Sequence, residues 1–181
     1  MGEVIRSVKW SEITCPEREG NYGAYDENEK TARGWFLHTI GIDLENIPEE
    51  LFEPCEWLDI DGMRLSKPYE ARVDIRDVFG TKRNDYAGKT WIDAFCREHK
   101  ALFHIRAGHV TRGKYFYMLK KHIEDQEPWV SLIKSKNGGY YVYRNGNHRI
   151  TFYKLMYLAD LANLGHGTNK YWLYAEVYDE L

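Results

Sequence analysis

One segment of the sequence combines a tight turn with polar residues that could hold an anion. Residues 140–143 read as a strand, and Asn145-Gly146-Asn147-His148-Arg149 follows almost directly. Asn and Gly tolerate the positive φ of a tight turn, and Asn is a favourable helix cap. The N–H groups of the first helical turn would then face outward at the positive end of the helix dipole. The segment therefore predicts a site for a phosphate or carboxylate.

The residue types in this turn suggest how the anion would be held. Arg149 can clamp a phosphate with two parallel N–H donors. His148 can donate to the phosphate or act as an acid or base near neutral pH, so it is the candidate catalytic residue. Asn147 is expected to cap the helix and to contact the ligand. The full predicted ligand-binding set is Arg144, Asn145, Gly146, Asn147, His148 and Arg149.

The two donor residues of the turn, His148 and Arg149, also have a purely structural interpretation. His148 could satisfy a buried carbonyl group, and Arg149 could pair with an acidic residue such as Asp179. Two adjacent donors at a helix start favour the anion site, because an anion gains most there. The sequence leaves both interpretations open.

Charge is distributed unevenly along the chain, although the net charge is only −3. Residues 1–62 hold 5 Lys or Arg and 15 Asp or Glu, whereas residues 82–121 hold 10 basic and 3 acidic residues. Such a basic segment could contact the backbone of DNA or RNA. The other interpretation is a solvated face balanced by the acidic part of the same fold. The candidate nucleic-acid contacts are Lys82, Arg83, Lys89, Arg106, Arg112 and Lys120.

The elements that must position the turn are clearest beyond Pro128. Residues 129–134 and 140–144 read as two strands, and a largely apolar helix is expected over about 148–163. Alternating apolar residues at 173–177 predict a closing strand. The turn would therefore lie between a strand and a buried helix.

Strands and helices are also expected upstream of this region. Asp61-Gly62 lies between two short apolar segments and predicts a two-residue β-hairpin, and residues 71–75 alternate as a half-buried strand does. Helical spacing predicts helices over about 92–102, with Thr90 as the cap, and over about 114–124. The order of elements indicates an α+β fold with a small mixed β-sheet packed on helices.

Length and composition fit one globular domain of 181 residues, of which 15% are aromatic. No apolar run approaches the roughly 18 residues of a membrane span, and the first residues have no apolar signal core. A cytoplasmic protein outside the membrane is expected. Cys15, Cys55 and Cys96 are odd in number and widely spaced, which favours reduced thiols over a disulfide framework.

Two further motifs fail on their spacing. Gly88-Lys89-Thr90 looks like the end of a phosphate-binding loop, but Arg83 stands where that loop requires glycine. Cys96 and His99 match no zinc pattern, and both fall on one apolar helix face. No metal site is therefore predicted from these residues.

Residues 128–179 resemble the ParB/sulfiredoxin-like superfamily. Its members share a strand, a Gly-containing turn that ends in His-Arg or Arg-Arg, a helix and a last strand. The matching parts here are residues 140–143, the turn Gly146 to Arg149, residues 150–163 and residues 171–178. The resemblance implies a ParB/sulfiredoxin-like core whose turn grips nucleotide phosphates, since characterised branches bind CTP, ATP or ADP there.

The chain departs from two branches of that superfamily. Sulfiredoxin has a reactive cysteine in the turn, where this chain has Asn147. Partition proteins of the ParB type have a Glu-Arg-Arg turn followed by a helix-turn-helix domain, but here only residues 150–181 follow the turn. Neither activity is therefore expected. A kinase or nuclease would need a carboxylate from elsewhere, and Glu17, Glu19 and Glu70 cannot be assigned to that role.

The leading hypothesis is an α+β protein that binds a nucleotide or another phosphorylated small molecule at residues 146–149. Mg²⁺ could accompany the nucleotide, and phosphoryl transfer or nucleotide hydrolysis would be the chemistry if the protein is an enzyme. One alternative is a non-enzymatic DNA-associated module that uses residues 82–121. Another is a protein–protein interaction module that uses the acidic residues 1–62. The oligomeric state is not determined by the sequence.

Overall fold

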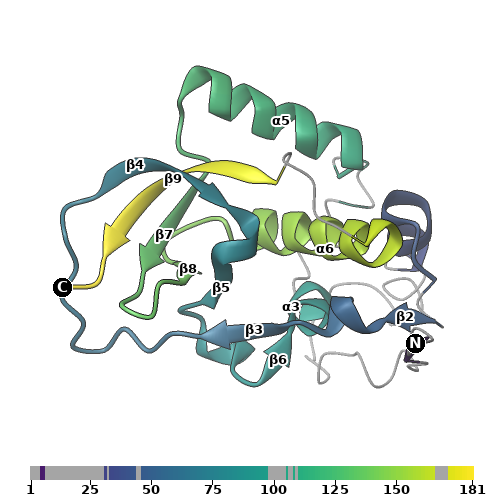
Figure 1. The fold of residues 1–181 in the computed structure, drawn as a ribbon, viewed down its shortest axis with the longest axis horizontal. Helices are drawn as coiled ribbons and strands as arrows, with labels where there is room; N and C mark the ends of the chain where they lie inside the picture. The colour runs from purple at the N-terminus through teal and green to yellow at the C-terminus, as the bar shows by residue number, and fades with distance from the viewer. Residues whose placement is uncertain are drawn as a thin grey trace.

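A mixed β-sheet of seven strands lies against the long helix α6 (Asn147–Leu164) at the centre of the molecule (Figure 1). The computed structural model describes residues 5–6, 31, 33–43, 46–97, 105, 108, 110–165 and 171–181. The fold is α+β, as the sequence predicts. No helix among these residues is long and apolar enough to cross a membrane.

The strand order of the sheet is β4-β9-β7-β8-β5-β3-β6. The pairs β7–β9, β5–β8 and β3–β5 are parallel, and the other neighbours are antiparallel. Two short strands, β1 and β2, pair separately. The strands are β1 Ile5–Arg6, β2 Ile47–Pro48, β3 Pro54–Trp57, β4 Tyr69–Asp74, β5 Val78–Thr81, β6 Lys89–Thr90, β7 Val130–Lys134, β8 Tyr140–Val142 and β9 Trp172–Asp179.

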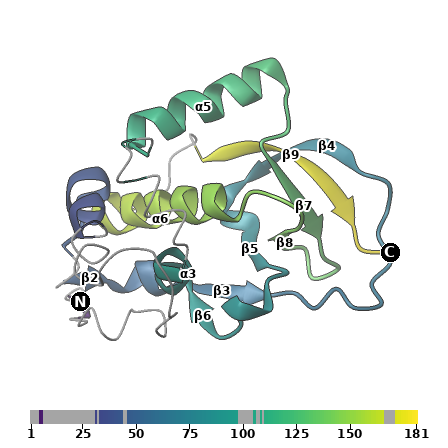
Figure 2. The same cartoon turned by 180° about the vertical axis from the view of Figure 1, so that it is seen from behind.

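Helices pack around this sheet, with α5 above α6 and α3 below it in Figures 1 and 2. Short 3₁₀ turns and one π-helical turn fill the connections. The elements are η1 Phe36–Ile40, η2 Glu49–Phe52, η3 Ile75–Asp77, η4 Asn84–Tyr86, α3 Trp91–Arg97 and α5 Arg112–Asp125.

The core gathers around α6, in which every residue from Ile150 to Asp160 is buried. Aromatic side chains from distant segments meet there: Trp35 stacks on Phe95 at 5.1 Å between ring centres and meets the edge of Phe152 at 5.0 Å. Offset and edge-to-face contacts of this kind add to the gain from apolar burial. The position of α6 is therefore set by the core.

One buried cation in α6 is part of this core. The Lys154 ammonium donates to the carbonyls of Ile75 and Val78 at 3.2 and 3.0 Å, and lies 2.8 Å from the Glu53 carboxylate. Burial lowers the pKa of Lys154, and the Glu53 carboxylate partly offsets that effect. The ammonium thus joins Glu53, which directly follows η2, together with η3 and β5, to the helix.

Several sequence predictions are confirmed by the observed elements. The predicted strands at 129–134, 140–144 and 173–177 correspond to β7, β8 and β9, and the predicted helix at 148–163 corresponds to α6. The helix cap at Thr90 is also found. Its hydroxyl accepts from the Asp93 N–H at 3.2 Å, and the Asp93 carboxylate accepts from the Thr90 N–H at 2.9 Å. The predicted continuation of α3 through residues 98–102 lies outside the described residues.

The predicted β-hairpin at Asp61-Gly62 is wrong. A turn is present, with the Met63 N–H donating to the Ile60 carbonyl at 3.0 Å, but its two arms do not pair with each other. Strand β3 pairs with β5 and β6 instead, and Leu65 forms a bridge with Glu180. Partners distant in sequence have taken the place of the local pairing.

Candidate anion-binding site

Gly146 makes the turn between β8 and α6, and only glycine fits its position. Its φ of 106° and ψ of 0° lie where residues with a side chain are strained. A Cβ atom there would also lie 2.5 Å from Cγ1 of Val130. Backbone conformation and packing against β7 therefore both require glycine, as the predicted tight turn implies.

The cap of α6 differs from the prediction. Gly146 occupies the N-cap position and Asn147 is the first helical residue, so the prediction that Asn147 caps the helix is wrong. The Asn147 side chain accepts a hydrogen bond from the Thr81 hydroxyl at 2.8 Å, which ties the helix start to β5. Because glycine has no side chain, Gly146 cannot accept a side-chain hydrogen bond from the N–H groups of the first turn of α6.

A hollow of about 440 Å³ opens beside this helix start. It lies between the first turn of α6, the beginning of β7 and the amino-terminal half of α5. Asn145, Gly146, His148 and Arg149 are on its wall, so the structure brings together four of the six residues of the predicted ligand-binding set. The remaining lining residues are Val110, Tyr115, Met118 and Trp129.

Arg149 lies on the exposed side of this hollow. One of its guanidinium N–H groups donates to the backbone carbonyl of Trp129, and the guanidinium carbon lies 6.0 Å from the centre of the Trp129 ring. The suggested pairing with Asp179 is not observed: no ion pair joins these two described residues, and Asp179 lies at the end of β9, where it accepts from the Tyr69 hydroxyl at 2.9 Å. A guanidinium has five N–H donors, so further donors of Arg149 are left for a ligand.

His148 is half-buried, and its Nε2 atom is fully buried. The residue lines the hollow, but the buried Nε2 does not face solvent, so contact with a ligand would have to come through its backbone N–H or the Nδ1 edge of the ring. Its role as an acid or base stays a prediction.

Tyr115 and Trp129 form an aromatic wall that sequence reasoning did not assign to the site. Their rings meet edge to face at 5.9 Å. Burial raises the pKa of Tyr115, and the nearby positive charge of Arg149 acts in the opposite direction. The Tyr115 hydroxyl is therefore protonated at neutral pH. The signal for this wall is tertiary, because α5 reaches α6 only through folding.

Arg144 lies outside the residues that line the hollow. Its guanidinium carbon is 5.2 Å from the ring centres of both Tyr143 and Tyr178. It therefore rests on the sheet surface next to the turn. Its contact with a ligand stays a prediction.

The predicted nucleic-acid contacts are spread over several elements of the fold. Lys120 is on α5 beside β9, whereas Lys89 is on β6 at the far end of the sheet. Five strand spacings of about 4.8 Å separate β9 from β6, which is roughly 24 Å. Both views place α5 and β6 at opposite margins of the molecule (Figures 1 and 2). The described basic residues of this segment therefore lie on well-separated elements, and their contact with nucleic acid stays a prediction.

Several of these basic side chains have local partners. Arg83 pairs with Asp85 at 2.7 Å, and Arg112 pairs with the largely buried Asp160. The Lys82 ammonium lies 4.7 Å from the centre of the Tyr143 ring. Arg106 lies outside the described residues. Arg112 in particular holds α5 against α6, which is a structural role.

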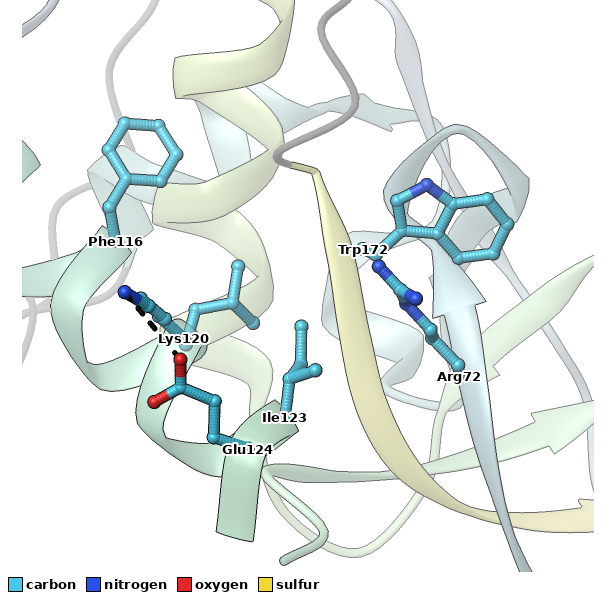
Figure 3. A pocket seen from close by; sticks show the side chains of 7 residues that line it. Arg72, Phe116, Lys120, Ile123, Glu124 and Trp172 are labelled. Atoms are coloured by element: carbon cyan, nitrogen blue, oxygen red, sulfur yellow. Dashed lines mark ion pairs between the residues drawn. The ribbon is translucent and has the colours of Figure 1, made fainter. Parts of the chain in front are cut away.

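A second hollow, of about 360 Å³, lies between α5 and the strands β4 and β9. Figure 3 shows Lys120 joined to Glu124, with Arg72 beside the ring of Trp172. The rest of the wall is Phe116, Leu119 and Ile123. Because its charged groups already have partners and its wall is mainly apolar, this hollow is a weaker anion site than the one at α6.

Carboxylates and thiols are absent from the described wall of the hollow at α6. No group of three His, Cys, Asp or Glu side chains able to hold a metal occurs among the described residues. Of the carboxylates considered for catalysis, Glu17 and Glu19 lie outside the described residues, and Glu70 accepts from the Tyr174 hydroxyl at 3.0 Å.

The chemistry of the site is that of an anion receptor with an aromatic wall. The donors are the N–H groups of the first turn of α6 and the guanidinium of Arg149. Comparison with known proteins adds no assignment: no family model matches the chain, and no curated protein or solved structure matches it significantly.

Proposed function

We propose that the hollow at the start of α6 binds a nucleotide or another phosphorylated small molecule. The observation that carries this proposal is the glycine N-cap at the wall of a hollow that also contains Arg149. Backbone N–H groups at a helix start and a guanidinium are both well-suited donors to phosphate.

The size of the hollow fits a ligand with more than a phosphate group. Its apolar lining includes Met118, which is 42% exposed, whereas Trp129 and Tyr115 are buried at 1% and 9% exposed and form the floor behind the donors. A volume of about 440 Å³ lies within the usual range for small-molecule sites, roughly 300 to 1,000 Å³. The resemblance of residues 128–179 to the ParB/sulfiredoxin-like superfamily supports ligand binding at the same turn. We therefore include a ParB/sulfiredoxin-like core in the proposal.

Binding is better supported than catalysis. Phosphoryl transfer relies on positioning and charge neutralisation, commonly through Mg²⁺ held by a carboxylate. The described wall has no carboxylate, so Mg²⁺ would enter bound to the phosphates of the ligand. Within that described wall, His148 stays the candidate acid or base.

The test is a thermal-shift series with phosphate, pyrophosphate and nucleoside mono-, di- and triphosphates, each with and without Mg²⁺. A ligand that binds only the folded protein stabilises it by about 2.7 kcal/mol at a concentration 100 times Kd. We expect at least one diphosphate or triphosphate to raise the melting temperature.

The matched variants are Arg149→Gln, on the wall of the hollow, and Lys136→Gln, in the turn after β7 and outside the predicted ligand-binding set. The first should lose the ligand-induced shift, and the second should retain it. No shift for any compound in the series would refute the proposal, and so would equal shifts in the wild type and the Arg149→Gln variant.

A further inference from the structure

Strand β4 forms one end of the sheet, and within the described residues its outer backbone edge has no partner strand. Strand β9 pairs with its inner edge, in a register that sets Asp74 opposite Trp172. The Ile75 N–H donates to the Tyr171 carbonyl at 2.9 Å, one step further in the same register. In an antiparallel pair the residues alternate between facing the partner strand and facing away. The backbone groups of Glu70, Arg72 and Asp74 therefore point to the free edge.

The charged side chains of β4 lie back over the sheet. The Glu70 carboxylate accepts from the Tyr174 hydroxyl at 3.0 Å, and the Arg72 guanidinium carbon lies 5.3 Å from the centre of the Trp172 ring (Figure 3). Both residues are exposed. Edge strands are commonly protected by bulges, by charges or by a covering element. Here the two charges are held by β9 on one face, which leaves the outward N–H and C=O groups accessible.

We propose that β4 is an interface through which a second copy of this chain pairs antiparallel, with Glu70 opposite Arg72 of the second copy. Each such pair would exchange two backbone hydrogen bonds, because both residues point to the free edge. A two-fold axis repeats the pair, so the interface is isologous and closed. The two sheets would then become one continuous sheet.

The charges on β4 favour this pairing register over the two registers that are shifted by two residues. A shift of the second copy by two residues one way sets Glu70 opposite Glu70. A shift the other way sets Arg72 opposite Arg72 and Glu70 opposite Asp74. Like charges directly opposite each other in a sheet are destabilising, and opposite charges are stabilising. The register with Glu70 opposite Arg72 is therefore the favoured one.

The test of the interface is the mass of the protein in solution, measured by sedimentation or light scattering from micromolar to millimolar concentration. We expect the wild type to form dimers as the concentration rises. Glu70→Arg and Arg72→Glu should each be monomeric under those conditions, because each sets like charges opposite each other. An equimolar mixture of the two variants should form a heterodimer. In that mixture one chain has arginine at both positions and the other has glutamate at both, so every facing pair is again of opposite charge.

The register has its own test. Ala71 lies on the two-fold axis as a pair without backbone hydrogen bonds, where Cα atoms are about 4.5 Å apart and a disulfide can form. Oxidised Ala71→Cys should therefore be a covalent dimer, whereas Tyr69→Cys, at an exposed position that lies opposite Val73 of the second copy, should not. Circular dichroism and melting temperature show that each variant is folded. A wild type that stays monomeric throughout, a dimer that persists in both charge variants, or a mixture that stays monomeric would overturn the proposal.

Discussion

Two cations on α6 show how one helix can hold both a structural charge and a candidate binding group. Lys154 is fully buried, and its ammonium has three partners: two backbone carbonyls and the Glu53 carboxylate. Arg149 is exposed at the helix start and uses one hydrogen bond, to the Trp129 carbonyl. The two cations differ in how many of their N–H donors already have a partner in the protein. A buried cation must use every donor, whereas an exposed one can keep donors for a ligand.

The largest effect on stability is expected from Lys154→Met. The apolar part of the side chain is kept, but the carbonyls of Ile75 and Val78 lose a buried donor and Glu53 loses its cation. Removing one member of a buried pair costs about 3 to 5 kcal/mol, and the partial exposure of Glu53 favours the lower value. Urea unfolding measures the free energy of unfolding.

The control is Lys120→Met on α5. Lys120 lies 3.5 Å from Glu124, and both side chains are largely exposed. Exposed pairs of this kind contribute little to stability, typically under about 1 kcal/mol. If the two variants lose similar stability, burial does not distinguish the cations and the comparison fails.

The next largest loss of stability is expected from Gly146→Ala, which tests the turn that positions Arg149. The added Cβ would meet Val130 at 2.5 Å in a backbone conformation that strains residues with a side chain. We expect a loss of about 2 to 3 kcal/mol in the free energy of unfolding. Gly138→Ala is the matched control, because Gly138 has a φ of 92° and open space around its Cβ position. A larger loss at Gly146 than at Gly138 isolates the contact with Val130.

A smaller effect on stability, with a larger one on binding, is expected from Arg149→Ala. The variant loses one hydrogen bond to a carbonyl, worth about 1 kcal/mol, while removing a cation from the positive end of the helix dipole offsets part of that loss. The ligand-induced rise in melting temperature should disappear. A loss of stability as large as that of Lys154→Met would show that Arg149 is also part of the scaffold.

The remaining prediction concerns the pH dependence of stability at Asp74, close to Lys154. Burial acts to raise the pKa of Asp74, but hydrogen bonds from Arg76 and the charges of Arg76 and Lys154 outweigh it, so the pKa of Asp74 is lowered on folding. A carboxyl group with a lowered pKa stabilises the fold above its unfolded-state pKa of about 3.9, and this contribution is lost as the pH falls through the folded-state value.

The variant that tests this pH dependence is Asp74→Asn. We expect it to be about 1 kcal/mol less stable than the wild type near neutral pH, and the difference should shrink in acid. Unfolding curves between neutral and acidic pH measure it. A difference that stays constant with pH would contradict a lowered pKa for Asp74.

Local sequence determined the elements around the candidate site. Gly146 predicted a turn because a positive φ favours glycine in any context, and its φ is 106°. The apolar run after His148 predicted a buried helix, and Thr90 predicted a helix start through its own hydroxyl. These features depend on residues a few positions apart, so the physical causes are present in the sequence itself.

Only the tertiary structure decided the partners of those elements. The Asn147 side chain accepts a hydrogen bond from Thr81, 66 positions away in the sequence, and Gly146 occupies the N-cap position in its place. Strand order separated Lys89 from Lys120, and it gave β3 distant partners in place of a hairpin at Asp61-Gly62. Such choices depend on which distant segments bury each other, and a local pattern carries no information about that competition.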